Sequence, residues 1–235
     1  MIKVNNLISI VVPVYNEGES IKILINEIFN VMDSHALQFE LIIINDGSVD
    51  NTINVLENLS VKIKQLIVIN LRKNYGQTAA LAAGFDNLNG EIIVTLDGDL
   101  QNDPSDIPKL ITKLNEGYDL ICGWRFQRKD KLLNRRIPSK IANRLIGNVT
   151  GIHLHDYGCS LKAFKREIVD DIKLYGELHR FLPVLANIEG AKIKEIKVNH
   201  RSRKYGHSKY GIDRTFRVLM DLLTVWFMNK FLTRP

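Results

Sequence analysis

Apolar and polar positions along the first half of the chain form blocks of two kinds. Short apolar runs predict strands at residues 7–14, 39–45, 65–70 and 91–96. The segments between them show helical periodicity and predict helices at residues 19–32, 50–59 and 77–88. Because the strands are apolar throughout rather than at every second position, we expect both faces of their sheet to be covered. The pattern predicts an α/β fold, with a mostly parallel sheet and helices on both faces.

The second half of the chain is expected to extend this domain. Further helices are predicted at residues 104–116, 166–173 and 180–188, and further strands at residues 119–124, 160–164 and 191–199. Residues 125–150 favour a basic helix that Pro138 interrupts, and residues 200–211 are expected to form a loop before a last helix at 212–232. No segment has the composition of a linker. We therefore expect one domain over residues 1–211, followed by a basic amphipathic helix at 212–235.

Polar sequences follow each of the first four predicted strands. These are PVYNEGES, NDGSVDNT, NLRKNYGQT and DGDLQNDP. In a parallel sheet, ligands bind outside the carboxyl ends of the strands. Carboxylates from three of these segments, Glu17, Asp46 and the pair Asp97 and Asp99, are therefore expected at one ligand-binding edge.

The segment LDGDLQND combines a candidate metal site with a candidate helix start. Asp97 and Asp99 are two residues apart, so in extended backbone both carboxylates lie on one side, where Gln101 adds another oxygen. Oxygen ligands suit Mg²⁺ or Mn²⁺ bound to a phosphate-containing substrate. The alternative is a solvated turn. Asp103 precedes Pro104 and is expected to cap a helix.

The charge of the chain is concentrated in two segments. The net charge is +6 over 235 residues. Residues 125–144 contain eight basic and one acidic residue, net +7, and residues 192–217 contain nine and two, again net +7. An anionic partner such as a phosphate, a nucleic acid or a membrane surface would match them. Two cysteines, Cys122 and Cys159, exclude a framework of disulfides.

Three motifs together resemble a known family. IVVPVYNEGESI, LIIINDGSVDNT and GEIIVTLDGDLQNDP occur in an order and at spacings similar to the nucleotide-sugar-binding half of the inverting family 2 glycosyltransferases with the GT-A fold. GWRFQRKD, HDYGCSLKAFKR and RKYGHSKYG resemble the subgroup that glycosylates polyprenyl phosphates of the undecaprenyl or dolichyl type. The resemblance implies a GT-A (Rossmann-like) domain with a donor-binding half at about 1–124 and an acceptor half at about 125–211.

The resemblance also implies roles for residues of the donor half. The donor would be a UDP- or GDP-linked sugar, and the expected donor contacts are Pro13, Tyr15, Glu17, Asp46, Gly76, Asp97 and Gly98. Asp97, Asp99 and Gln101 would hold Mg²⁺ or Mn²⁺ on the diphosphate, with Asp99 counted among the catalytic residues. Without the family register, plain turns would be the favoured interpretation of Pro13, Gly76 and the dipeptide Asp46-Gly47.

The acceptor half would bind a lipid phosphate. Its expected ligands are Arg125, Arg128, Arg201, Arg203, Ser208 and Lys209. Arginine binds phosphate in a bidentate manner, and a phosphate is already ionised at neutral pH, so it needs positioning rather than a base. Arg125 and Asp156 are the catalytic candidates here. Asp156 either orients an arginine, acts as a base, or forms only an Asx-turn before Gly158.

The last predicted helix suggests contact with a membrane. Its polar stripe contains Arg214, Arg217, Asp221 and Thr224, and its apolar surface contains Phe216, Leu219, Leu222, Leu223, Trp226 and Phe227. Such a helix suits the headgroup layer on the cytoplasmic face of the membrane, and packing on the domain is the alternative. Because similar proteins carry spanning helices after this point, we expect part of a longer anchored protein rather than a peripheral enzyme.

Other functions remain as alternatives. A family 2 transferase could use a saccharide hydroxyl in the synthesis of a cell-surface polysaccharide, and it would then need a base. A nucleic-acid-binding module is disfavoured because no nucleic-acid motif accompanies the basic segments. A catalytically silent lipid-binding relative is disfavoured because every position of the metal motif is filled. No nucleic acid is therefore expected among the partners, which can include further copies of the chain.

Overall fold

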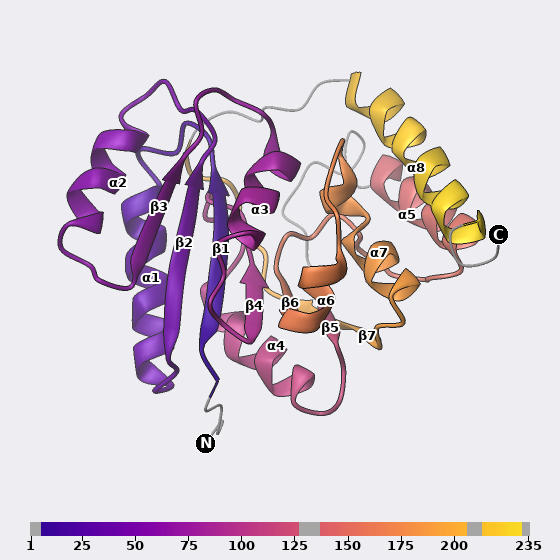
Figure 1. Cartoon of the computed structure of the whole chain (residues 1–235), viewed down its shortest axis with the longest axis horizontal. Helices are drawn as coiled ribbons and strands as arrows, with labels where there is room; N and C mark the ends of the chain where they lie inside the picture. The colour runs from indigo at the N-terminus through magenta and orange to yellow at the C-terminus, as the bar shows by residue number, and fades with distance from the viewer. Residues whose placement is uncertain (1–5, 127–136, 206–212, 232–235) are drawn as a thin grey trace.

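A seven-stranded sheet forms the centre of the molecule. The computed structural model describes residues 6–126, 137–205 and 213–231. The strands are β1 (Ile8–Val14), β2 (Phe39–Asn45), β3 (Leu66–Asn70), β4 (Ile92–Thr95), β5 (Leu120–Arg125), β6 (Lys162–Lys165) and β7 (Ile193–Val198). Their order across the sheet is β3-β2-β1-β4-β6-β5-β7, and Figure 1 shows β1, β2 and β3 side by side with their carboxyl ends at the same edge.

Strand β6 is the exception to the parallel arrangement. It runs antiparallel to both of its neighbours, β4 and β5, whereas β1, β2, β3 and β4 are joined in parallel and β7 runs parallel to β5. Because β6 is reversed, the residues that precede it lie at the edge where β4 and β5 end. The predicted mostly parallel sheet is confirmed.

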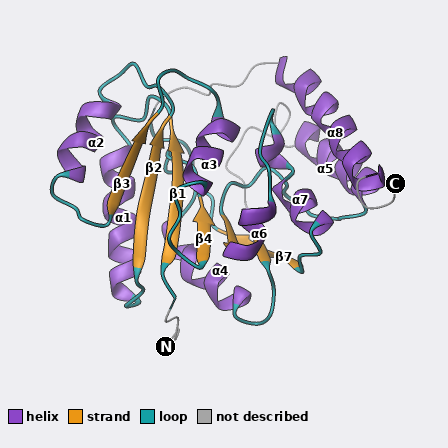
Figure 2. Ribbon diagram, viewed as in Figure 1, coloured by secondary structure: helices purple, strands orange, loops and turns teal. Residues whose placement is uncertain are grey.

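Helices cover both faces of the sheet, as predicted (Figure 2). One face carries α1 (Ile21–Ser34), α2 (Thr52–Ser60) and α4 (Ile107–Leu114), with the helical turn η1 (Pro104–Asp106) before α4. The other carries α3 (Gln77–Phe85), α5 (Ile137–Thr150), α6 (Arg166–Asp171), α7 (Leu182–Ile188) and α8 (Asp213–Phe231), with the turn η3 (Leu178–Arg180). The continuous apolar runs of β1 and β2 follow from this double cover.

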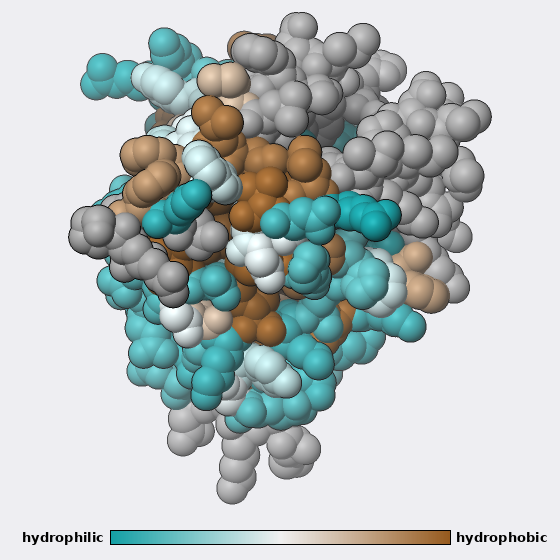
Figure 3. Space-filling view, turned by 90° about the vertical axis from the view of Figure 1, so that its right-hand side faces the viewer, coloured by the Kyte–Doolittle hydropathy of each residue, from teal (hydrophilic) through white to brown (hydrophobic). Residues whose placement is uncertain are grey.

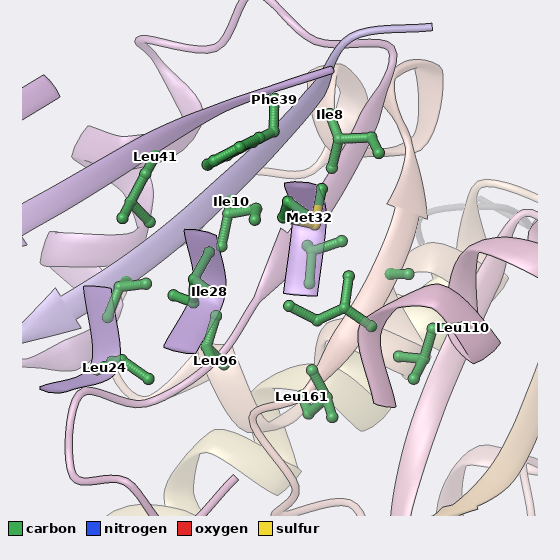
Figure 4. Close-up of a cluster of buried hydrophobic side chains, with 14 of the residues drawn as sticks. Ile8, Ile10, Leu24, Ile28, Met32, Phe39, Leu41, Leu96, Leu110 and Leu161 are labelled. Atoms are coloured by element: carbon green, nitrogen blue, oxygen red, sulfur yellow. The ribbon is translucent and has the colours of Figure 1, made fainter. Parts of the chain in front are cut away.

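Alternate residues of β1 belong to two different cores. Ile8, Ile10 and Val12 pack with α1 on one face, whereas Val11 packs with α3 on the other. Figure 4 shows the first core, where Ile10 of β1 lies among the side chains of α1. These residues are inaccessible to solvent, and each fully buried aliphatic side chain contributes about 1.5–3 kcal/mol to folding.

Two prolines mark helix starts. Helix α5 begins at Ile137, so Pro138 lies in its first turn, where a missing N–H is tolerated. The prediction that Pro138 interrupts this helix is therefore wrong. Asp103 caps η1 as predicted, since its Oδ1 accepts a hydrogen bond from the Ser105 N–H at 3.0 Å.

Helix α8 packs on the domain with one side and exposes an apolar surface on the other. Leu222 and Val225 are buried in the core formed with α5 and α7, so Leu222 does not belong to the exposed surface predicted for it. Asp221 accepts a hydrogen bond from the Glu177 N–H at 3.2 Å, so it faces the domain rather than an open polar stripe. The side chains of Arg214, Phe216, Arg217 and Leu219 lie outside the described ones. No helix in the described ranges has the length and apolarity required to cross a bilayer.

Candidate active site

The carboxyl ends of β1 and β4 bring two carboxylates, those of Glu17 and Asp99, close to Arg203, and a third, that of Asp97, close to Asp99. Asp99 Oδ2 is in an ion pair with Arg203 Nη2, and Arg203 Nη1 lies 3.7 Å from Glu17 Oε1. Asp97 Oδ1 accepts a hydrogen bond from Gln77 Nε2 at 2.7 Å. Arg203, predicted to bind the acceptor phosphate, therefore lies beside two carboxylates that were predicted for the donor side.

Asp99 has more negative charge near it than Arg203 balances. It is only 8% exposed, and burial together with the charge of Asp97 raises the pKa of the Asp99 carboxyl to about 6, although Arg203 acts in the opposite direction. A buried carboxylate beside a second carboxylate favours an additional cation. The position taken by the Arg203 guanidinium is thus one where positive charge is stabilised.

The carboxylates of Asp97 and Asp99 are suitable ligands for a divalent ion that also binds substrate. Asp97 and Asp99 supply carboxylate oxygens, but within residues 6–126, 137–205 and 213–231 no three metal-ligating side chains gather into a complete site. Mg²⁺ and Mn²⁺ commonly take one or two carboxylates and fill the remaining positions with water and phosphate oxygens. Gln101 was predicted as a third metal ligand. In the structure its Nε2 lies 3.4 Å from the carbonyl oxygen of Arg201.

Ser20 links two parts of the donor side. Its hydroxyl lies 2.7 Å from Glu17 Oε2 and 3.1 Å from the carbonyl oxygen of Gly98. Gly98 itself is packed tightly against β1, since a Cβ at this position would lie 2.6 Å from Val14 Cγ1. Close packing therefore accounts for this glycine, which was expected as a donor contact.

Asp46 fixes the loop that leads into α3. Its two carboxylate oxygens accept hydrogen bonds from the N–H groups of Tyr75 (2.7 Å) and Gly76 (2.9 Å). Burial raises the pKa of the Asp46 carboxyl, and these two hydrogen bonds oppose the rise. Gly76 has a φ of 94° and open space where a Cβ would be. Pro13 and Tyr15 are half-buried at the end of β1.

A buried ion pair joins the two catalytic candidates predicted for the acceptor side, Arg125 and Asp156. Arg125 Nε and Nη2 donate to Asp156 Oδ2 (2.7 Å) and Oδ1 (2.8 Å), a bidentate arrangement. Asp156 is 2% exposed. Burial acts to lower the pKa of Arg125, but the hydrogen bonds and charge of Asp156, with a smaller contribution from Asp97, raise it. Asp156 therefore has the geometry of an orienting residue, with both oxygens bound to a guanidinium.

The remaining predicted acceptor ligands are separated or not described. Arg201 forms ion pairs with Glu27 (2.7 Å) and Asp103 (2.8 Å), so in this structure its guanidinium faces α1 and η1. Arg128, Ser208 and Lys209 lie outside the described residues.

Comparison with known proteins gives the family. Residues 9–173 match the family described as Glycosyl transferase family 2. The chain belongs to this family. The predicted resemblance is confirmed, and the chain is a glycosyltransferase.

This family 2 glycosyltransferase is similar in sequence to two proteins whose names describe sugar transfer to a polyprenyl phosphate. The chain is 46% identical over 232 residues to the dodecaprenyl-phosphate galacturonate synthase of Rhizobium johnstonii, a match that covers 97% of this chain and 69% of that protein. It is 42% identical over 220 residues to the undecaprenyl-phosphate 4-deoxy-4-formamido-L-arabinose transferase of Shewanella sediminis, covering 93% and 66%. The chain thus spans about two thirds of the length of each relative.

Solved structures confirm the fold of the glycosyltransferase. A crystal structure of glucosyl-3-phosphoglycerate synthase from Mycobacterium tuberculosis, in complex with Mn²⁺, UDP and phosphoglyceric acid, superposes with a TM-score of 0.71 at 20% identity. The match covers 96% of this chain and 78% of that one. The predicted GT-A-like architecture is therefore confirmed.

Three residues of the site were missed in the sequence. Gln77 contacts Asp97, Ser20 contacts Glu17, and Asn102 Oδ1 accepts hydrogen bonds from the Ser160 hydroxyl (2.7 Å) and the Asp97 N–H (3.4 Å). Gln77 follows Gly76 in the quoted motif NYGQT, so its position at a helix start was a usable signal. Asn102 and Ser160 are 58 residues apart, and no local pattern joins them.

Proposed function

We propose that this glycosyltransferase moves a sugar from a UDP- or GDP-linked donor to a polyprenyl phosphate, with inversion at the anomeric carbon, on the cytoplasmic face of the membrane. The observation that carries the proposal is the bidentate pair of Arg125 and Asp156. A saccharide hydroxyl needs a base, and the predicted candidate for that base, Asp156, is bound through both oxygens to a guanidinium. A lipid phosphate needs no base, only cationic positioning. The names of both relatives, which refer to polyprenyl phosphates, support this acceptor.

In this proposal the donor side binds the diphosphate. Asp97 and Asp99 would hold Mg²⁺ or Mn²⁺, which when bound neutralises the charge that develops on the leaving nucleoside diphosphate. Gln77 fixes the carboxylate of Asp97, and Asp46 fixes the loop at Gly76 beside which there is open space. Arg125 then presents positive charge toward the acceptor phosphate from the end of β5.

The membrane part of the proposal rests on α8. Its exposed large side chains are Met220, Leu223, Trp226, Phe227 and Phe231, and Lys230 lies over the ring of Trp226 at 5.2 Å. Figure 3 shows hydrophobic residues gathered on this face of the molecule. Aromatic and basic side chains on one helix face suit the headgroup layer. Mutation of both Trp226 and Phe227 to Ser should reduce cosedimentation with anionic vesicles about tenfold or more, whereas Val61→Ser, which changes an exposed valine on another surface, should not.

The decisive experiment offers one lipid in two forms. The protein is incubated with Mn²⁺, nucleotide sugars and either undecaprenyl phosphate or undecaprenol, and the products are identified by mass spectrometry. We expect a glycolipid only from the phosphate. No glycolipid from any common nucleotide sugar would refute the proposal, and transfer to an oligosaccharide offered in a parallel incubation would favour the alternative acceptor.

A further inference from the structure

The turn that carries Asp156 is held by a glutamate of β7, Glu195, whose side chain is largely but not fully buried. Glu195 Oε1 accepts a hydrogen bond from the Asp156 N–H at 2.8 Å. Glu195 Oε2 accepts another from the His155 N–H at 3.0 Å and lies 2.7 Å from His155 Nδ1. The Glu195 side chain is only 9% exposed. One carboxylate thus fixes two successive backbone N–H groups, and with them the direction in which the Asp156 side chain leaves the backbone.

A buried lysine holds the other end of the same turn. Lys162, at the start of β6, is 3% exposed, and its ammonium group donates to the carbonyl oxygen of Cys159. Cys122 of β5 pairs with Lys162 on one side and with Glu195 on the other. Glu195 and Lys162 therefore lie in register on either side of Cys122. The Glu195 carboxylate accepts from N–H groups of the turn, and the Lys162 ammonium donates to a carbonyl oxygen of the turn.

Aromatic packing joins the turn to the strand that carries Arg125. The ring of Trp124 stacks on His155, with centroids 4.0 Å apart and planes at 15°. Lys197 of β7 lies 4.0 Å from the centroid of Phe126. The residues on either side of Arg125 are thus packed by the same elements that position Asp156.

We propose that Glu195 is a positioning residue for Arg125, acting through the backbone of the turn at His155 and Asp156. Glu195 binds these N–H groups with both of its oxygens, so its contribution is to fix the carboxylate that in turn fixes the guanidinium. The inference rests on the proposed function in one respect, that Arg125 meets the acceptor phosphate.

Glu195→Gln tests the inference at nearly constant size. Glutamine has one carbonyl oxygen, so its amide N–H₂ must face an N–H donor of the turn. We expect the Arg125 Nε–H signal in nitrogen-15 NMR, slow to exchange with solvent in the wild type, to exchange about tenfold faster or more. We also expect kcat/KM for polyprenyl phosphate to fall about tenfold to 100-fold, since small misplacements of a positioned group have effects of this size. Nucleotide binding, measured by calorimetry, should not change.

A control and a double variant make the result specific. The control is Glu167→Gln. Glu167 lies 3.8 Å from Lys165, and its change should leave hydrogen exchange at Arg125 and sugar transfer unaffected. In an Asp156→Asn background, Glu195→Gln should lower kcat/KM by no more than about twofold, because residues that act in series are not additive.

Two outcomes would overturn the inference. Unchanged exchange at Arg125 in folded Glu195→Gln would do so, and so would a full additional loss of kcat/KM in the double variant. Circular dichroism establishes folding, and Glu195→Asp, which keeps the charge but shortens the side chain, replaces Glu195→Gln if the latter does not fold. If the wild type transfers no sugar to polyprenyl phosphate, the proposed function fails, whereas exchange at Arg125 still decides the role of Glu195.

Discussion

Asp99 and Asp156 are both buried aspartates at the same edge of the sheet, but the charges around them differ. Asp99 has a second carboxylate beside it, and one guanidinium shared with Glu17. Asp156 has a guanidinium bound to both of its oxygens. The first site retains an excess of negative charge, which suits a metal-bound diphosphate, whereas the second is balanced and suits the positioning of an arginine. Identical side chains therefore have different chemistry because of their partners.

The largest expected loss of activity follows from a change at Asp99, the site with excess negative charge. Asp99→Asn removes a charge that the bound ion would need, so we expect transfer to fall about 1,000-fold. Binding of Mn²⁺ with UDP, measured by electron paramagnetic resonance, should be lost as well. Asp103→Asn is the matched control, because asparagine also caps a helix and Asp103 pairs with Arg201 rather than with the metal motif. Equal losses in both variants would contradict the distinction.

A change at Asp156, whose charge is balanced by Arg125, should lower the stability of the protein as well as its activity. Asp156→Asn leaves Arg125 buried without its counter-charge, so we expect the free energy of unfolding to fall by about 3 kcal/mol and transfer to fall about 100-fold. The double variant Arg125→Met with Asp156→Leu should recover stability but not transfer. Chemical denaturation and lipid-product assays measure the two effects. A loss of transfer with unchanged stability would instead indicate that Asp156 acts as a base.

The pH dependence of stability should separate the two sites further. The folded pKa of Asp99 is about 6, above its ordinary value of 3.8, so the folded state binds the proton more tightly. Protonated Asp99 therefore favours folding below pH 4, and this contribution is lost as the pH rises through 6. In EDTA, Asp99→Asn should be more stable than the wild type by about 3 kcal/mol at pH 8. The difference should close near pH 4, and a constant difference across this range would refute the assignment.

The smallest expected effect concerns the arginine among the donor-side carboxylates. Because Arg203 contacts Asp99 directly, it competes with any other cation there. Arg203→Ala should therefore tighten Mn²⁺ binding to the nucleotide-free protein about fivefold, the size expected of a partly exposed ion pair. Arg201→Ala, which removes pairs with Glu27 and Asp103 only, should not. A weaker affinity in Arg203→Ala would contradict the competition.

Much of the fold could be predicted because its signals are local. The apolar runs of β1 and β2 are continuous since each strand contacts helices on both faces, and this is visible in the sequence. The cap at Asp103 is likewise set by the residues next to it. The antiparallel direction of β6 was not predicted, because a four-residue strand takes its direction from the path of the chain before it.

The partners within the site could be predicted only in part. Asp97 and Asp99 were recognisable because they are neighbours in sequence. The contact between Arg203 and Asp99 spans 104 residues, and that between Glu195 and Asp156 spans 39. Such contacts depend on the register of strands brought together by folding, and nothing in the sequence near Glu195 distinguishes it from a surface glutamate on an edge strand.

The reversed strand β6 also limits how the protein can be divided. It belongs to the second half of the chain, yet it lies between β4 and β5, which both belong to the first half. A fragment ending after β5 would lack the strand that joins β4 to β5. The predicted donor and acceptor halves are therefore interleaved in the sheet, and we do not expect either to fold alone. An exchange of acceptor specificity with a relative would therefore require transplanting individual loops, because a swap of the whole second half would replace a strand in the middle of the sheet.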